Sequence, residues 1–231
     1  MRCWYLAAVL AAVPGCSNLT EEGGVAGLEV RVPRPPVVEV GQTIQLSARA
    51  LDRQGDSVGA AITWLTPDTT VTLTPTGLMT GRTGGTTARV QAQVDSIASD
   101  FVTFTVNPRP DTLKIVGDSI FVVASGVTTS APLVASLQSF APAIALPNDV
   151  ITYTVVSPVF ADPTQRTVQL PGGLLTLGAI TGVDGSPLPP VALSRVTGTT
   201  SPDSAIVTVS AQTAAGAVVP GSGQRFIVRF Q

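Results

Sequence analysis

Ile44-Gln45-Leu46-Ser47-Ala48-Arg49-Ala50 is the stretch of sequence that decides the fold. Apolar and polar side chains alternate through it, so that Ile44, Leu46, Ala48 and Ala50 point to one face. This period of two residues indicates a strand with one buried face, because successive side chains of a strand point to opposite sides. No window of the chain shows a convincing helical period of about 3.6 residues. We therefore expect an all-β protein.

Similar short runs flank this stretch and are separated by turn signals. Leu28–Val32 precedes it, and Ala61–Leu65, Thr86–Val94 and Phe101–Val106 follow it. Asp52-Arg53-Gln54-Gly55-Asp56 has the composition of a turn between strands. The pattern predicts roughly seven strands within about 80 residues, which is the spacing of a β-sandwich.

The pattern recurs in the second half of the chain. Two prolines in Asn107-Pro108-Arg109-Pro110 interrupt the first unit, because proline removes a backbone donor and restricts the preceding residue. We expect one unit at 28–107, a stiff linker at 108–111 and a second unit at 112–231, since ordered echoes favour a duplication. The echoes are Val38–Thr43 with Val123–Thr128, Ile62-Thr63-Trp64 with Ile151-Thr152-Tyr153, Val90–Gln93 with Val209–Gln212, and Phe101–Val106 with Arg225–Phe230.

The first unit carries an ordered set of motifs: a glycine-led strand, a tryptophan strand, a hairpin and a strand start. This set resembles the bacterial immunoglobulin-like group 2 family over about 80 residues, whereas the second unit matches only generically. The resemblance implies two tandem immunoglobulin-like β-sandwiches on an exported protein, and says less about activity. The motifs are Val40–Ala48, Ile62-Thr63-Trp64, Gly77-Leu78-Met79-Thr80-Gly81 and Gly84-Gly85-Thr86-Thr87.

The N-terminus has the organisation of an export signal. Met1-Arg2 is followed by the apolar run Cys3–Val13, which is shorter than the roughly 20 residues that span a bilayer. Val13-Pro14-Gly15-Cys16 then resembles the lipobox of bacterial lipoproteins. The resemblance implies cleavage of a signal peptide at 1–15 and lipidation of Cys16. The open alternative is an ordinary signal peptide with an incidental cysteine.

A lipid on Cys16 implies a membrane anchor. Each buried CH₂ contributes about 0.8 kcal/mol, so that two or more acyl chains hold a protein stably on a membrane. Residues 16–27 are polar and glycine-rich and read as a flexible tether. We expect an exported protein that is lipid-anchored in the cell envelope, and Ser17 favours the outer membrane among lipoproteins of this kind.

Composition argues against several classes of function. The net charge is −2 with no basic cluster, which speaks against nucleic-acid binding because phosphates call for a cationic stripe. The chain has no histidine, and its two cysteines, Cys3 and Cys16, lie in the N-terminal segment, so no Ser-His-Asp or Cys-His site is available. Lys114 alternates with apolar residues and is typical of an exposed strand lysine. We expect no cofactor and no enzymatic activity.

Few side chains qualify as site residues. Asp52 and Asp56 flank Gly55 and are weak candidates for a calcium site, since Ca²⁺ prefers clustered oxygens, but they also suit a turn. Trp64 and Tyr153 occupy equivalent strand positions. We expect both to pack in the cores between sheets, and the rival interpretation is an exposed platform for stacking sugars.

An insertion at about 159–200 lengthens the second unit and is rich in Pro, Gly and Leu. Long loops on rigid sandwiches often bind partners, so it is a candidate interaction surface. Additional core strands are the alternative, which we favour slightly. Overall we expect adhesion or binding of an unknown protein or glycan partner, with a structural spacer or accessory subunit as the alternative.

Overall fold

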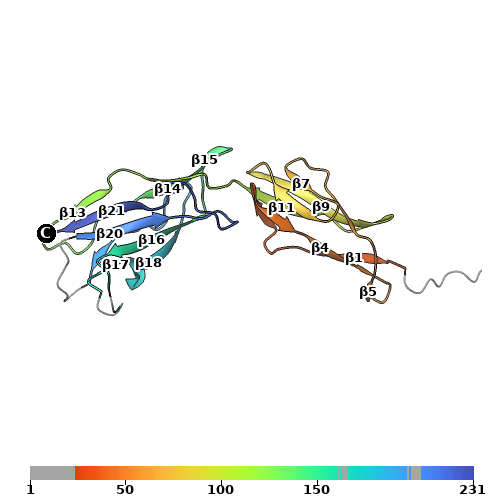
Figure 1. The fold of residues 1–231 in the computed structure, drawn as a ribbon, viewed down its shortest axis with the longest axis horizontal. Coiled ribbons are helices and arrows are strands. Elements are labelled where there is room, and N and C mark those ends of the chain that lie inside the picture. Colours follow the sequence, from red (N-terminus) through yellow and green to blue (C-terminus); the bar gives the residue numbers. More distant parts are fainter. Residues whose placement is uncertain (1–23, 161, 163–165, 197, 199–203) are drawn as a thin grey trace, which may run out of the picture.

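The computed structural model describes residues 24–160, 162, 166–196, 198 and 204–231. No α-helix occurs within these ranges, where strands make up nearly all of the regular structure. The prediction of an all-β chain is confirmed. The strands form two sandwiches that lie end to end (Figure 1).

The first sandwich is built from eleven short strands between residues 27 and 107. One layer contains the sheets β1-β4-β5 and β3-β8-β7, and the other has the order β10-β9-β11-β2, with β6 also paired to β9. The strands are β1 (Gly27–Arg31), β2 (Val37–Glu39), β3 (Thr43–Gln45), β4 (Ser47–Leu51), β5 (Ser57–Val58), β6 (Thr63–Leu65), β7 (Val71–Leu73), β8 (Leu78–Gly81), β9 (Thr86–Val94), β10 (Ile97–Ala98) and β11 (Val102–Asn107).

The alternating stretch around Leu46 differs from the single strand that the sequence predicts. Burial alternates through it as expected, with Leu46 and Ala50 buried. However, β3 pairs with β8 and β4 pairs with β1. Leu46 lies between the two strands and donates its amide to the Gly77 carbonyl at 2.8 Å. One periodic run therefore serves two sheets, because alternation fixes which side is buried but not the pairing partner.

The second sandwich has two main sheets and one small sheet. Their strand orders are β12-β14-β15, β13-β21-β20-β16-β18 and β17-β19. The strands are β12 (Thr112–Ile115), β13 (Ile120–Val123), β14 (Ala135–Phe140), β15 (Ala143–Ala145), β16 (Val150–Ser157), β17 (Val168–Gln169), β18 (Thr176–Ile180), β19 (Ser194–Arg195), β20 (Ser204–Ser210) and β21 (Gln224–Phe230).

The two units share one pattern of strand pairing. The closing strand β11 pairs antiparallel with β9 and parallel with β2. In the same way, β21 pairs antiparallel with β20 and parallel with β13. The hairpin-like pairs β1–β4 and β12–β14 also correspond. Both units are therefore immunoglobulin-like β-sandwiches, in which the closing strand lies between an early strand and its own predecessor.

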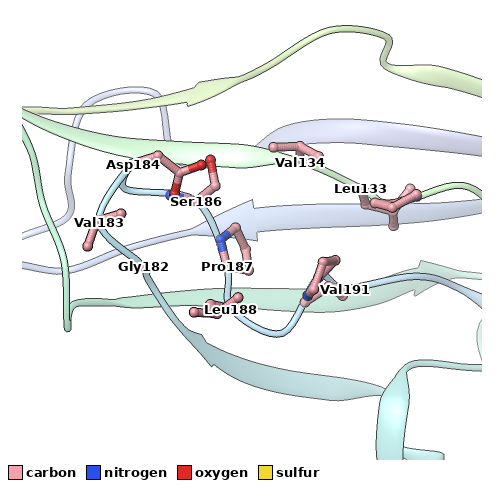
Figure 2. A pocket seen from close by; sticks show the side chains of 11 residues that line it. Leu133, Val134, Gly182, Val183, Asp184, Ser186, Pro187, Leu188 and Val191 are labelled. Carbon is pink, nitrogen blue, oxygen red and sulfur yellow. The ribbon is translucent and has the colours of Figure 1, made fainter.

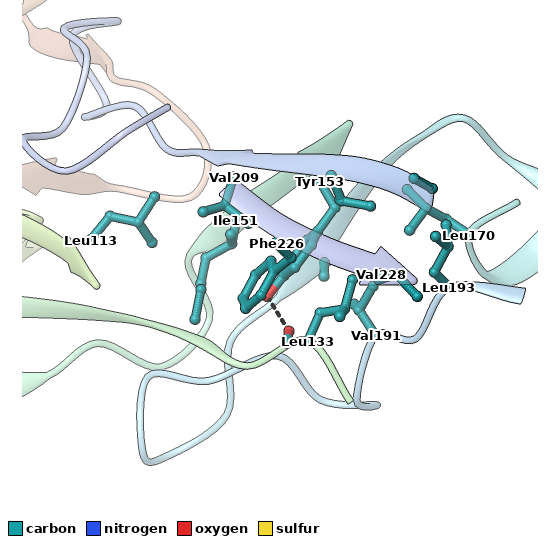
Figure 3. Close-up of a cluster of buried hydrophobic side chains, with 14 of the residues drawn as sticks. Leu113, Leu133, Ile151, Tyr153, Leu170, Val191, Leu193, Val209, Phe226 and Val228 are labelled. Atoms are coloured by element: carbon teal, nitrogen blue, oxygen red, sulfur yellow. Dashed lines mark hydrogen bonds between the residues drawn. The ribbon is translucent and has the colours of Figure 1, made fainter. Parts of the chain in front are cut away.

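Each sandwich has a separate apolar core. The first core is centred on Phe104, Met79 and Trp64. The second is larger and is centred on Tyr153 and Phe226, as Figure 3 shows. Apolar burial is the main driving force for folding, so each unit carries its own source of stability.

Candidate functional site

The predicted lipidation residue, Cys16, lies outside the described residues. The described chain begins at Gly24, just before β1. Strand β1 leads into the first sandwich from the end that is remote from the second (Figure 1). Gln231 lies at the far end of the second sandwich. None of the described residues belongs to a helix that is long and apolar enough to cross a membrane. The lipid anchor remains a prediction.

The candidate calcium ligands Asp52 and Asp56 lie in the tight turn between β4 and β5. The Asp52 carboxylate accepts the amides of Gln54 at 2.9 Å and Asp56 at 2.8 Å. The Asp52 amide also donates to the Asp56 carbonyl at 2.9 Å. These bonds are those of an aspartate that shapes a turn. Within the described ranges, no group of three or more acidic, histidine or cysteine side chains is placed to hold a metal ion.

Trp64 lies in the core of the first sandwich. It is 5% exposed on β6 and faces Ala92 of β9. Gly77 passes so close to its indole that a Cβ atom at that position would lie 2.6 Å from Nε1. A ring enclosed in this way offers no face for stacking on a sugar.

Tyr153 lies at the centre of the second core. It is fully buried on β16, stacks on Phe226 at a centroid distance of 6.4 Å and donates its hydroxyl to the Leu133 carbonyl at 2.9 Å (Figure 3). Burial raises the pKa of the Tyr153 phenol, because the charged form is poorly solvated there. Tyr153 faces Val209 of β20. The two aromatic positions predicted as equivalent thus occupy corresponding strands, each buried between two layers.

The insertion is divided between core and surface. Val168, Leu170, Val191 and Leu193 are buried and belong to the second core. Its strand β18 extends the five-stranded sheet by pairing with β16. Much of the insertion is therefore part of the sandwich itself, which agrees with the interpretation of the insertion as additional core strands.

A cavity of about 410 Å³ lies between the segment that leads into β14 and the loop after β18 (Figure 2). Leu133, Val191 and Leu188 contribute apolar walls, and Leu188 is 68% exposed. Asp184 and Ser186 are the polar side chains among the eleven lining residues. The Asp184 carboxylate accepts a hydrogen bond of 3.0 Å from the Ser186 amide. The cavity can accommodate an apolar group, but it lacks the convergent polar groups that orient a specific ligand.

A polar site at the junction of the two sandwiches was not predicted from the sequence. Glu39, at the end of β2, is only 8% exposed, and its carboxylate accepts the Ala214 amide at 2.9 Å. Ala214 belongs to the turn between β20 and β21 of the other sandwich. Burial raises the pKa of Glu39; the Ala214 amide and Arg109 oppose this rise, and Asp149 and Asp111 add to it. Glu39 follows the apolar residue Val38 in an alternating run, and this position predicts a side chain that faces solvent. No signal in the sequence therefore identifies Glu39 as a buried residue at the junction.

The linker packs against the first sandwich and is hydrogen-bonded to the second. A Cβ atom at Gly84 of the first sandwich would lie 2.6 Å from the Cα atom of Pro108. Arg109 contacts Asp111 with two hydrogen bonds, of 2.7 and 2.9 Å. Asp111 in turn accepts the Phe140 amide of the second sandwich at 2.8 Å. Although burial opposes ionisation of Asp111, these partners hold the pKa of its carboxyl below the usual value.

No family model and no curated protein matches the chain. The group 2 resemblance of the first unit therefore stays a prediction. Among solved structures, the chain is similar to the adhesin InvE of Yersinia pseudotuberculosis, with 18% identity over 92% of this chain and a TM-score of 0.43. This chain spans 61% of that adhesin chain.

Two further solved structures show comparable similarity. Domains 4 and 5 of the S-layer protein SbsC are 16% identical over 89% of this chain and 98% of theirs, with a TM-score of 0.32. The D00-D0 domain of intimin is 14% identical over 87% of this chain and 98% of that chain, with a TM-score of 0.30. The fold assignment rests on the strand order described above.

Proposed function

We propose that the chain is a non-catalytic lipoprotein of the bacterial cell envelope whose two sandwiches bind a protein or glycan partner. The observation that carries the proposal is the end-to-end arrangement of the two units, with β1 in the first unit and the C-terminus at the far end of the second (Figure 1). If Cys16 carries lipid, this arrangement holds the second sandwich away from the membrane. Exposed loops of a rigid scaffold held in that way are suited to contacting a partner.

Several features are consistent with a non-catalytic role. The chain has no histidine, and its charged residues make up 12%. The cavity beside Leu133 presents apolar walls and an Asp184 carboxylate that is already bonded to the Ser186 amide. Catalytic sites instead bring together groups with matched pKa values and free hydrogen-bonding capacity.

The lipid anchor can be tested on the native protein. Mass spectrometry of its N-terminal peptide is expected to show a diacylglyceryl mass on Cys16, and Cys16→Ser should release the protein from the membrane fraction. Cys3→Ser is the matched control, because Cys3 lies in the predicted leader and should leave processing unchanged. A native product without lipid, or a Cys16→Ser protein that stays in the membrane fraction, argues against the anchor.

Partner binding needs a separate test. Envelope extracts are passed over the immobilised protein, and any captured component is purified and titrated back. A saturable isotherm supports the binding function. Its absence favours the second candidate, a spacer that holds another component at a distance from the membrane. A direct hydrogen bond between the units favours this second candidate, because the Ala214 amide of the second sandwich donates to the Glu39 carboxylate of the first.

A further inference from the structure

A hydrogen bond joins the two sandwiches outside the linker. The Ala214 amide of the second sandwich donates to the Glu39 carboxylate of the first at 2.9 Å, although the two residues are 175 positions apart. Glu39 is only 8% exposed, and a hydrogen bond with little access to water is stronger than one in solvent. Chain connectivity does not impose this contact. It exists only while the two sandwiches are docked.

The acceptor is fixed on the first sandwich. The Glu39 amide donates to the Gln42 side chain at 2.9 Å, and the Glu39 carbonyl accepts the Gln42 amide at 2.9 Å. Glu39 also lies beside Asn107 in the parallel pair of β2 and β11. Gly81 of β8 passes so close that a Cβ atom there would lie 2.5 Å from the Glu39 carbonyl oxygen. The backbone that carries the carboxylate is therefore held in place by its neighbours.

The donor is fixed on the second sandwich by a closed turn at 213–217, which we call the clamp turn. The Gly216 amide donates to the Thr213 carbonyl at 2.8 Å, and the Thr213 amide donates to the Ala217 carbonyl at 2.9 Å. The Thr213 hydroxyl accepts the Ala217 amide at 3.1 Å. Ala214 is the second residue of this turn, between β20 and β21. Its amide therefore has little freedom to follow Glu39 when the sandwiches rotate.

The linker adds contacts beside this bond. A Cβ atom at Gly84 of the first sandwich would lie 2.6 Å from the Cα atom of Pro108. Arg109 donates two hydrogen bonds to Asp111, of 2.7 and 2.9 Å, and Asp111 accepts the Phe140 amide of the second sandwich at 2.8 Å. The linker is thus packed on one sandwich and bonded to the other. Bending at the linker has to disturb contacts on both sides.

We propose that the hydrogen bond between the clamp turn and Glu39 fixes the angle between the two sandwiches, so that they move as one rigid rod. Two domains joined by a short linker move relative to each other by default. A second attachment beside the linker removes the rotation that the linker alone permits. The inference goes beyond the proposed function, because it holds whatever the protein binds and whether or not Cys16 carries lipid.

Two variants remove the bond from opposite sides. Ala214→Pro removes the donor without opening the turn, because proline has no amide hydrogen and its fixed φ suits the second position of a turn. Glu39→Ala removes the acceptor and leaves the backbone bonds around β2 in place. In the docked arrangement, each variant leaves the other partner without its hydrogen bond, which is unfavourable. We expect both variants to behave as hinged pairs of sandwiches.

Single-molecule fluorescence transfer on the full chain tests the clamp. Cys3→Ser and Cys16→Ser remove the native thiols, and Thr72→Cys and Thr176→Cys introduce exposed dye positions, one on each sandwich. We expect one narrow transfer population for this parent chain, and its replacement by a broad population in both variants. A broad distribution in the parent chain, or a narrow population that survives in either variant, overturns the proposal.

Two further variants separate the clamp from a general loosening of the second sandwich. Ser125→Pro is the matched control, because it places proline at the second position of another turn, which the Val127 amide closes on the Ala124 carbonyl at 3.0 Å, and it should keep the narrow population. The double variant of Glu39→Ala and Ala214→Pro should be no broader than either single variant, since both remove the same bond. Broadening by Ser125→Pro, or a double variant that is broader than both single ones, contradicts the clamp. Circular dichroism of each variant establishes that it is folded before its transfer distribution is interpreted.

Discussion

The Tyr153 hydroxyl donates a hydrogen bond of 2.9 Å to the Leu133 carbonyl and so joins β16 to the segment that leads into β14. The two strands belong to different sheets of the second sandwich. This bond closes the core across its two layers. It also gives the buried Tyr153 hydroxyl a hydrogen-bond partner, and a buried polar group without a partner is costly.

Tyr153→Phe is expected to destabilise the second sandwich by about 1–3 kcal/mol, because the ring remains while the Leu133 carbonyl loses its donor. Tyr153→Ala should cost more, about 3–5 kcal/mol, since it also leaves a cavity. Denaturant titration of both variants measures the difference. Equal stability of Tyr153→Phe and the parent chain contradicts a structural role for the hydroxyl.

The ionisation of Tyr153 is expected to be coupled to unfolding. Burial raises its pKa above the ordinary value of 10.0. Because the folded state holds the phenol proton more tightly than the unfolded state, the folded protein is fully stable below the pKa of the unfolded state. This stability is lost as the pH rises through the pKa of the folded state. Ultraviolet absorbance of tyrosinate should therefore appear together with alkaline unfolding. The signal should come from Tyr153 once the leader with Tyr5 is removed, and a separate, earlier titration contradicts the buried placement.

Gly77→Ala is expected to destabilise the first sandwich more than Gly55→Ala does. Both glycines have a positive φ, of 86° and 88°, so each variant carries the strain of about 1 kcal/mol that alanine meets in this region. A Cβ atom at position 77 also meets Trp64 Nε1 at 2.6 Å, whereas space is open at position 55. Thermal unfolding monitored by Trp64 fluorescence reports the difference. Equal shifts show that the Trp64 contact relaxes without cost.

Asp68→Asn is expected to lower the thermal midpoint at neutral pH. Hydrogen bonds from the Arg89 side chain and amide hold the pKa of Asp68 below its ordinary value of 3.8. This stabilisation is present above the ordinary pKa and is lost as the pH falls through the lowered one. The variant and the parent chain should therefore converge in acid. Asp100→Asn, at an exposed position, is the control. The difference between its thermal midpoint and that of the parent chain should not change between neutral and acidic pH.

The sequence predicts the faces of the strands better than their partners. Alternation from Ile44 to Ala50 matches the observed burial, but the split between two sheets depends on contacts with Met79 and Val30 that the local pattern does not encode. Trp64 and Tyr153 stand out because large aromatic side chains bury the most surface. Residues 28–107 and 112–231 each surround one core, although the boundaries themselves remain predictions.

The junction site illustrates what local patterns leave out. Glu39 occupies the polar position of an alternating run and reads as solvent-exposed. It is instead only 8% exposed, and its carboxylate accepts the Ala214 amide from 175 residues away. Residues whose environment is created by a second domain are accessible to prediction only when the docking of the two domains is known.

The insertion at about 159–200 contains both buried and exposed leucines, and its composition does not tell them apart. Substitutions at one leucine of each kind therefore test what the insertion contributes to stability. Leu193 is fully buried, and its amide donates to the Ser130 hydroxyl at 3.0 Å. Leu188 is 68% exposed at the mouth of the cavity. Leu193→Ala is therefore expected to cost about 2–5 kcal/mol of unfolding free energy.

Leu188→Ala should stay within about 0.5 kcal/mol of the parent chain, as surface substitutions usually do. Denaturant titration of both variants measures the pair under identical conditions. A similar, small effect at both positions indicates that the insertion is a peripheral attachment. A large effect at Leu193 alone means that the segment completes the sandwich, and that a binding role for the insertion is confined to exposed residues such as Leu188 and Val183, which is 92% exposed.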